Sequence, residues 1–364
     1  MRPGTAENAH VPFLSRARRR TPRAAAALFA AAGLALATAC TPAAAPEAAA
    51  PTTTTPAPPP PPPVFSWPLT GVETPDPVHR PALAVKIENS VAARPQSGLN
   101  AADTVWEEVV EGGITRFVAV YHSQLPPEIG PIRSIRPMDA PIAAPLRGLF
   151  AFSGGQRDFV NAISAAGMQV VSNDGGAAGF YRNQTRRAPH NVYANPADLL
   201  AQADAAHTAD PVEQFRFARA ADRPSALDVG VPTAVLGLKL SGVGNPVWSW
   251  SAPDAAWLRA EGAAPATQAD GQQLRATNVV VLRVDVVNTR YTDPAGNPVP
   301  ETAMVGTGEA VVATGGHTMQ ATWSKASDGE RVVLTDVHGG PILLAPGSTW
   351  VELVPNGTGA VTFG

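Results

Sequence analysis

Two arginines lie three residues apart in the stretch GPIRSIRPMD, which runs from Gly130 to Asp139. The prolines and the leading glycine disfavour a long helix, so Arg133 and Arg136 are predicted to be fixed cations on a rigid loop. The planar guanidinium of arginine suits a carboxylate or phosphate held by two hydrogen bonds. These residue types in this pattern therefore indicate recognition of an anion.

The segment around this stretch is basic within an acidic chain. Between Pro131 and His190 there are seven arginines and three acids, whereas residues 40–364 carry a net charge of −8. The Ser-Gly-Gly turn that follows an apolar run would let backbone N–H groups approach an anion next to a helix N-terminus. We predict an anion-binding cleft formed by Arg133, Arg136, Arg157, Arg186, Arg187, Ser153, Gly154, Gly155, His190 and Asn191.

The alternative is that these arginines are structural. They would then be solvated or paired with the acids of a neighbouring segment, which are Asp103, Glu107, Glu108 and Glu111. The acidic balance of residues 40–364 disfavours nucleic acid as a partner, because phosphate backbones would be repelled.

His190, in the motif RRAPHN, is the candidate acid–base residue. Histidine titrates near neutral pH, and neighbouring arginines would hold an anionic substrate beside it. The alternative is a histidine that bonds loop backbone. The sequence has no HxxH, HExxH or EF-hand pattern, and AFSGG lacks the first glycine of a GxSxG nucleophile elbow. A non-catalytic protein without a metal or cofactor is therefore favoured over an enzyme.

The runs TVWEEVV and TRFVAVYH flank a Gly-Gly pair and predict a β-hairpin. With these glycines as a two-residue turn, Val109 would face Arg116. Arg116 would then lie diagonally between Glu107 and Glu111 and form salt bridges with them. Those two acids would be about 13 Å apart along a strand, which is too far for the carboxylate pair of a glycosidase.

Helical spacing predicts helices over residues 158–167 and 195–207, the second capped by Asn195. From about residue 232 onward, β-prone runs alternate with turn signals. The motif TWSK in this part is predicted to contribute a buried strand tryptophan, Trp323, rather than one that stacks on a sugar.

The predicted fold class is α+β. A mixed α/β domain over residues 66–231 would be followed by a smaller, mostly-β domain over residues 232–364. Residues 40–65 are rich in Ala, Pro and Thr and are predicted to be a tether, because such a tract cannot bury apolar surface and favours extended polyproline conformations.

The N-terminal sequence predicts that the protein is exported. A basic stretch precedes an apolar run of 16 residues, Ala24–Ala39, which is shorter than the roughly 20 residues that span a bilayer. The single cysteine, Cys40, follows directly. The order Leu-Ala-Thr-Ala-Cys resembles the lipobox of bacterial lipoproteins, which implies a signal peptide over residues 1–39 and a lipid anchor at Cys40. The protein would then be held on the outer face of the cytoplasmic membrane. The alternative is an ordinary signal peptide.

Longer sequence motifs in the chain resemble those of the YerB-like family of bacterial lipoproteins. They include RPALAVKIEN, GPIRSIRP and RRAPHNVY in the first part and VGTGEAVV, TWSK and PILLAPGSTWVELVP in the second. The resemblance spans nearly all of residues 67–355 and implies two domains on a membrane anchor, without an established activity. It departs at Glu88, where the family pattern has aspartate, and in VWSWSAPDAAWLRAEG, where only the spacing of aromatic residues and Arg259 match.

Three functions follow as hypotheses. The first is a lipid-anchored binding module for an anionic envelope ligand, such as a wall polymer or a peptidoglycan fragment. The second is a cell-wall hydrolase or transferase with His190 as acid and base. The third is an envelope scaffold that binds proteins through residues 232–355.

Overall fold

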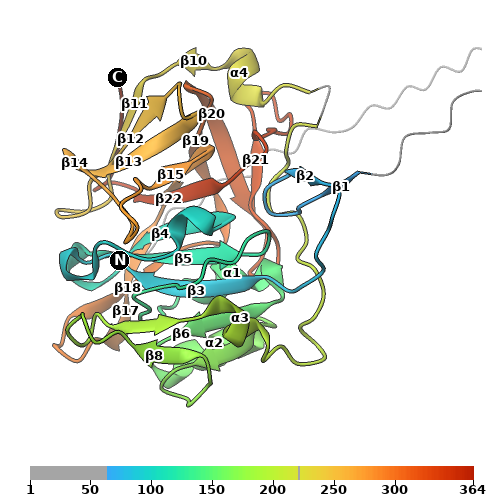
Figure 1. Ribbon diagram of the computed structural model, residues 1–364. Helices are drawn as coiled ribbons and strands as arrows, with labels where there is room; N and C mark the ends of the chain where they lie inside the picture. Colours follow the sequence, from blue (N-terminus) through green and yellow to red (C-terminus); the bar gives the residue numbers. More distant parts are fainter. Residues whose placement is uncertain (1–63, 220–221) are drawn as a thin grey trace, which may run out of the picture. The chain divides into compact units, whose positions relative to one another are not determined.

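A sheet of eleven strands runs through the part of the chain that the computed structural model describes, residues 64–219 and 222–364 (Figure 1). All but one of its strands form a single path, and β21 (Val333–Thr335) pairs with β20 outside it. In spatial order the path is β10 (Val231–Pro232), β20 (His317–Lys325), β19 (Gly306–Thr314), β16 (Asn278–Val284), β22 (Thr349–Pro355), β4 (Thr104–Val109), β5 (Thr115–Tyr121), β3 (Leu83–Glu88), β6 (Leu149–Phe152) and β7 (Gln169–Ser172).

A second sheet of six strands covers one face of the first. It comprises β14 (Ala264–Pro265), β13 (Ala256–Glu261), β12 (Pro246–Ser251), β11 (Val235–Lys239) and β23 (Ala360–Phe363), with β15 (Arg275–Ala276) on β13. Three two-stranded ribbons complete the strands. They are β1 (Phe65–Ser66) with β2 (Glu73–Thr74), β8 (Phe180–Arg182) with β9 (Val192–Ala194), and β17 (Val286–Thr292) with β18 (Pro298–Thr302).

The helices are short. The α-helices are α1 (Asp139–Ala143), α2 (Arg157–Ala165), α3 (Pro196–Leu200) and α4 (Ser225–Val229). The 3₁₀ turns are η1 (Val91–Ala93), η2 (Leu99–Ala101), η3 (Glu111–Gly113) and η4 (Ala144–Leu146). Strands therefore dominate, and the mixed α/β character predicted for the first domain is present only as a few helical turns. No helix within residues 64–219 and 222–364 is both long and apolar enough to cross a membrane.

The two faces of the large sheet carry separate apolar cores, because successive side chains of a strand point to opposite sides. Trp106 and Val118 belong to one core, while their chain neighbours Val105 and Phe117 belong to the other. The central strands are buried on both faces. The core therefore lies on both sides of the strands that carry the candidate site.

The large sheet crosses the predicted boundary between residues 231 and 232. Strand β22, from the second half of the chain, pairs in parallel with β4, from the first half, at Trp350↔Val105. All described residues belong to one compact unit. The two-domain division stays a prediction, and the predicted signal peptide, Cys40 and residues 40–63 lie outside the described residues.

The predicted hairpin is present, but its register was wrong. Glu108, rather than Val109, lies opposite Arg116. The two glycines do not form a two-residue turn, because the 3₁₀ turn η3 begins at Glu111 and lengthens the loop. A shift of one residue moves Glu107 to the other face of the strand, and Glu111 pairs with Arg136 instead. The predicted salt bridges between Arg116 and Glu107 or Glu111 are therefore absent among the described residues.

The predicted helix over residues 158–167 forms as α2 and ends, as expected, before a glycine with positive φ, Gly167. The helix predicted over residues 195–207 begins with the expected cap, since the Asn195 side chain accepts a hydrogen bond from Ala197 N. It ends already at Leu200. The turn beyond it is held by Gln169, whose side chain donates to Gln202 O and accepts from Asp204 N.

Candidate functional site

The candidate site lies where three parallel strands end. Strands β3, β6 and β7 are neighbours and run in the same direction, so their carboxyl ends share one edge of the sheet. Ligands of open parallel sheets bind outside this edge. The segment from Gly130 to Pro137, here called the arginine loop, crosses it and forms an isolated bridge with β3 at Ile87↔Ile132.

Backbone hydrogen bonds hold the arginine loop between β3 and the end of β6. Arg133 N donates to Lys86 O at 2.9 Å, and Ser153 N donates to Arg133 O at 3.0 Å. Ile135 N donates to Gly154 O at 3.0 Å. The loop therefore continues the sheet over a few residues, and its backbone is held by hydrogen bonds on both sides.

Arg133 and His190 meet at a buried carboxylate, Glu88. His190 Nδ1 lies 2.9 Å from both oxygens of Glu88, and Arg133 Nε lies 3.5 Å from Oε2. Ser90 Oγ donates to Oε1 of the same carboxylate at 2.9 Å. The side chains of Arg133 and His190 are each 25% exposed, whereas that of Glu88 is 2% exposed. Arg133 and His190 thus contact the same buried acid, and both side chains are partly exposed to solvent.

Arg136 is paired within the protein, which indicates a structural role. Its Nε donates to both oxygens of Glu111, at 2.7 and 2.9 Å, and its backbone N donates to Asp139 Oδ2 at 2.6 Å. This pair agrees with the alternative in which arginines neutralise the acids of the hairpin.

Arg116 adds a third guanidinium that the sequence did not place in the site. It is buried on β5 opposite Glu88 and donates to Ser134 O of the arginine loop. Burial, together with the nearby Arg136 and Arg133, lowers its pKa to about 10, against the opposing effect of Glu111 and Glu88. Its Nε is buried without a hydrogen-bond partner in the described part of the chain.

A fully buried triad underlies these arginines. Lys86 Nζ donates to Glu108 Oε1 and, at 2.7 Å, to Asp139 Oδ1. Burial raises the pKa of Glu108 to about 8, with the neighbouring Asp139 adding to the effect and Lys86 opposing it. Asp139 also accepts from Arg136 N, so the triad is joined to the arginine loop.

The remaining predicted residues lie near this edge with different environments. Arg157 and Arg187 are exposed. Arg186 donates to the backbone oxygens of residues 93–95, and Asn191 Oδ1 accepts from Arg182 at 2.8 Å. The three residues of the Ser-Gly-Gly turn follow β6, and the N–H of Ser153 is engaged by the arginine loop. Their roles in ligand binding stay predictions.

A second charged cluster lies on the opposite face of the sheet, and the sequence did not predict it. Arg259 of β13 is fully buried and contacts Glu107 at 2.7 Å, with Glu261 and Glu352 each at 2.9 Å. Its guanidinium also lies 5.1 Å from the centre of the Trp350 ring. Burial acts to lower the pKa of Arg259, but the three carboxylates raise it above its ordinary value.

One acid of this cluster, Glu352, has a raised pKa. Burial raises the pKa of Glu352, and the neighbouring Glu107 raises it further, against the effect of Arg259. Trp248 Nε1 donates to Glu352 at 2.8 Å. Because Arg259, Glu107 and Glu352 join the two sheets and are buried, we assign them a structural role.

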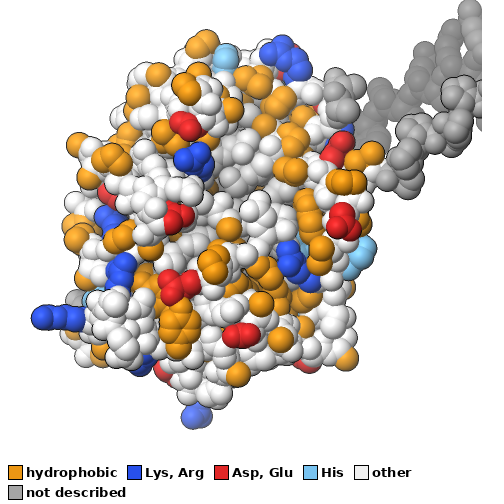
Figure 2. Space-filling view, viewed as in Figure 1, with side chains coloured by type: hydrophobic (Ala, Val, Ile, Leu, Met, Phe, Trp, Pro, Cys, Tyr) orange, Lys and Arg blue, Asp and Glu red, His pale blue; other side chains and the backbone are white. Residues whose placement is uncertain are grey.

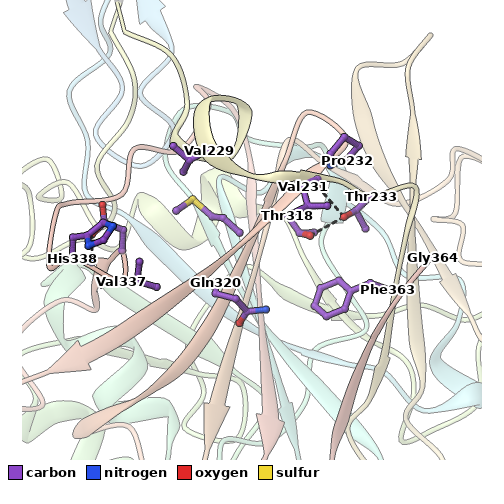
Figure 3. A pocket seen from close by; sticks show the side chains of 12 residues that line it. Val229, Val231, Pro232, Thr233, Thr318, Gln320, Val337, His338, Phe363 and Gly364 are labelled. Carbon is purple, nitrogen blue, oxygen red and sulfur yellow. Dashed lines mark hydrogen bonds between the residues drawn. The ribbon is translucent and has the colours of Figure 1, made fainter.

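A pocket of about 660 Å³ lies among β10, β20 and the C-terminal residues and carries few charged groups (Figure 3). Val229, Val231, Val337 and Phe363 surround it, and a hydrogen bond of 2.7 Å joins Thr233 to Thr318 beneath Val231. Its walls are mostly apolar, and it holds none of the predicted site residues. In the described residues no group of three or more His, Cys, Asp and Glu side chains is placed to hold a metal.

Charged side chains are dispersed on the face that Figure 2 shows, where Lys and Arg alternate with Asp and Glu among uncharged residues. This face carries no broad patch of one sign.

Trp323 is buried on β20, as predicted, with Nε1 donating to Arg283 O at 2.9 Å.

Two family models match the chain. The model described as "Protein of unknown function (DUF3048) N-terminal domain" matches residues 69–209, and that of the DUF3048 C-terminal domain matches residues 237–351. A curated relative, "Putative lipoprotein YerB" of Bacillus subtilis (strain 168), is 38% identical over 130 residues, which are 35% of this chain and 39% of the relative. The match thus spans less than half of the relative's length.

A solved structure shares the fold. The crystal structure of the YerB protein from Bacillus subtilis superposes with a TM-score of 0.68 at 21% identity, covering 82% of this chain and 99% of that one. At this identity the similarity shows the fold alone.

Proposed function

Since the chain belongs to the YerB-like family of DUF3048 proteins, we propose that it is a lipid-anchored extracytoplasmic protein that binds an anionic ligand. The matches to the two family models confirm the resemblance that was predicted from the sequence motifs. The family description names no activity, so the proposal depends on the cluster at the arginine loop. The lipid anchor at Cys40 and the position on the outer face of the membrane are supported by the lipobox pattern and by the name of the curated relative.

The observation that carries the proposal is an excess of buried guanidinium donors. Three arginines, Arg116, Arg133 and Arg136, gather around two acids, Glu88 and Glu111. Nε of Arg116 and Nε of Arg133 are both buried without a hydrogen-bond partner in the described residues. A buried donor that is left unpaired is costly, and the side chain of Arg133, which is 25% exposed, can meet an anion from solvent.

The triad beneath the arginines does not supply the missing negative charge. Lys86 neutralises one carboxylate, and a Glu108 with a pKa of about 8 is mostly protonated at neutral pH. The cluster therefore keeps about one positive charge in excess. An anionic group of an envelope polymer, carboxylate or phosphate, matches this charge.

The experiment is thermal unfolding of the full chain, purified in detergent, with phosphate, acetate, peptidoglycan fragments and phosphodiester-linked wall polymer. A ligand at about 100 times its dissociation constant should add roughly 2.7 kcal/mol to the free energy of unfolding. Arg133→Ala should abolish the stabilisation. Arg290→Ala is the matched control, because Arg290 is 80% exposed and lies outside the cluster. Equal stabilisation of wild type and Arg133→Ala would refute the proposal.

The other two hypotheses differ in support. The enzymatic hypothesis gains support from the contact between His190 and Glu88. The scaffold hypothesis stays a prediction.

A further inference from the structure

The imidazole of His190 is oriented by a carboxylate. Nδ1 lies 2.9 Å from both oxygens of Glu88, so an Nδ1–H donates to that group and the Nε2 lone pair is left free. Glu88 is itself held by Ser90 Oγ and by the nearby Arg133. A buried acid that fixes the tautomer of a partly exposed histidine is the arrangement that a proton-transferring imidazole requires.

The loop that carries His190 is fixed as well. His190 N donates to Arg187 O, and Asn183 N donates to Asn191 O, both at 2.9 Å. The loop connects β8 to β9, and β9 is bridged to the segment before the arginine loop at Ile129↔Ala194. Within the described residues Nε2 of His190 has no hydrogen-bond partner.

We propose that Glu88 and His190 form a proton-transfer dyad and that the anion bound at Arg133 is a phosphodiester that this dyad hydrolyses. The inference rests on the proposed function, because the ester must be held by the same arginine. It adds a reaction and a substrate class to that function.

Within the cluster of Arg116, Arg133 and Arg136, one guanidinium is left for a ligand, which matches a singly charged ester. Arg136 is paired with Glu111, and Arg116 is directed to Ser134 O. Arg133 is left, with a contact of only 3.5 Å to Glu88 and a side chain that reaches solvent. A phosphodiester carries one negative charge on two non-bridging oxygens, which match the two parallel N–H groups of one guanidinium.

The step is a hydrolysis in which water is the second reactant. His190 Nε2 takes a proton from water while the water oxygen forms a bond to phosphorus. The bond from phosphorus to the leaving alkoxide breaks, and the alkoxide takes the proton from Nε2. The dyad ends in its starting state, and the products are a phosphomonoester and an alcohol. Glu88 acts as a positioning residue that also stabilises the imidazolium.

The assay follows 4-nitrophenolate release from bis(4-nitrophenyl) phosphate by the full chain in detergent. We expect His190→Ala to lower kcat by about 100-fold or more, in the range for loss of a general acid–base. Glu88→Gln should lower kcat with little change in KM, and Glu88→Asp should recover part of the rate because it restores the carboxylate. His338→Ala is the control, since His338 is an exposed histidine far along the chain from the dyad.

Binding of the probe, followed by thermal unfolding, separates the two proposals. Binding without nitrophenolate release, or a rate that survives His190→Ala, overturns the hydrolytic inference alone. A wild type that neither binds nor cleaves the probe overturns the inference and also excludes phosphodiesters as the proposed ligand.

The tautomer supplies an independent readout. In protein labelled with ¹⁵N-histidine, the long-range ¹H–¹⁵N spectrum of His190 should show protonated Nδ1 and unprotonated Nε2, and Glu88→Gln should change that ratio without altering His338. A His190 signal that is unaffected by Glu88→Gln would contradict the positioning role.

Discussion

Neighbouring glutamates of β4 have different partners, because successive side chains of a strand point to opposite faces. Glu107 contacts Arg259 of the second sheet, whereas Glu108 contacts Lys86 below the arginine loop. The first pair belongs to a closed structural cluster, and the second lies next to the candidate site. At the scale of residues, chemistry is therefore decided by which face a side chain occupies.

The buried Glu108 predicts a dependence of stability on pH. Burial, with Asp139 adding to it, raises the pKa of Glu108 from 4.5 to about 8, so the folded protein keeps a proton that the unfolded chain releases. This stabilising contribution is complete below about pH 4.5 and is lost as the pH rises to about 8. Glu108→Gln removes the titration. Relative to the variant, the wild type should lose at most about 1.4 kcal/mol per pH unit over this window.

Urea denaturation of both proteins at pH 5, 6.5 and 8 measures this difference. Parallel pH profiles for wild type and Glu108→Gln would show that Glu108 titrates at the same pH in the folded and unfolded states.

At the scale of elements, the arginine loop is positioned by strands on both sides and by a tight approach at its first residue. A Cβ on Gly130 would lie 2.4 Å from Cδ1 of Tyr193, whose ring is fully buried. Gly130 also exchanges backbone hydrogen bonds with Ser97. The loop can therefore enter the sheet only with glycine at this position.

Gly130→Ala should therefore destabilise the protein and displace the arginine loop. We expect a loss of roughly 1–3 kcal/mol in the free energy of unfolding, as for other overpacked sites, together with weaker binding of the anionic ligand. Chemical denaturation and the binding assay measure the two effects. Gly242→Ala is the matched control, because a Cβ there meets no atom within 4 Å. Equal stability of the two variants would disprove the tight approach.

At the scale of the whole molecule, the large sheet and the buried Arg259 join the two halves of the chain. Arg259 lies on the second sheet, while Glu107 and Glu352 lie on the first. Removing the arginine would leave carboxylates buried without their partner, which costs about 3–5 kcal/mol. The expected result is that Arg259→Met unfolds at a much lower urea concentration than the wild type.

Arg290→Met is the comparison for this prediction. Its single ion pair, with Asp158 at 3.6 Å, is exposed and should contribute about 0–1 kcal/mol. A loss at Arg259 no larger than that at Arg290 would contradict the structural role of the buried cluster.

The shared sheet also predicts that residues 66–231 do not fold alone. Without β22, strand β4 would expose an unpaired edge, and Glu107 would lose Arg259. We expect aggregation, or far-ultraviolet circular dichroism without a cooperative thermal transition. A cooperative transition of the isolated segment would instead support two independent domains, as the sequence pattern indicated.

Local features of this protein could be predicted because they depend on neighbours in the chain. Most strand segments, helix α2 with Gly167 beyond its end, the Asn195 cap and the rigid arginine loop all follow from side-chain periodicity and from the conformations of glycine and proline. The register of the hairpin could not be predicted, since one extra residue in the turn reverses every side chain.

What the sequence determined by itself was thus the type and position of the main elements, the family, and the presence of arginines and His190 on one loop-rich segment. The tertiary structure decided which of those groups act together. His190 meets Glu88 across 102 residues, and Arg259 meets Glu352 across 93. Such contacts depend on strand order and register over the whole sheet, which local patterns do not encode because the paired residues approach each other only after the chain has folded.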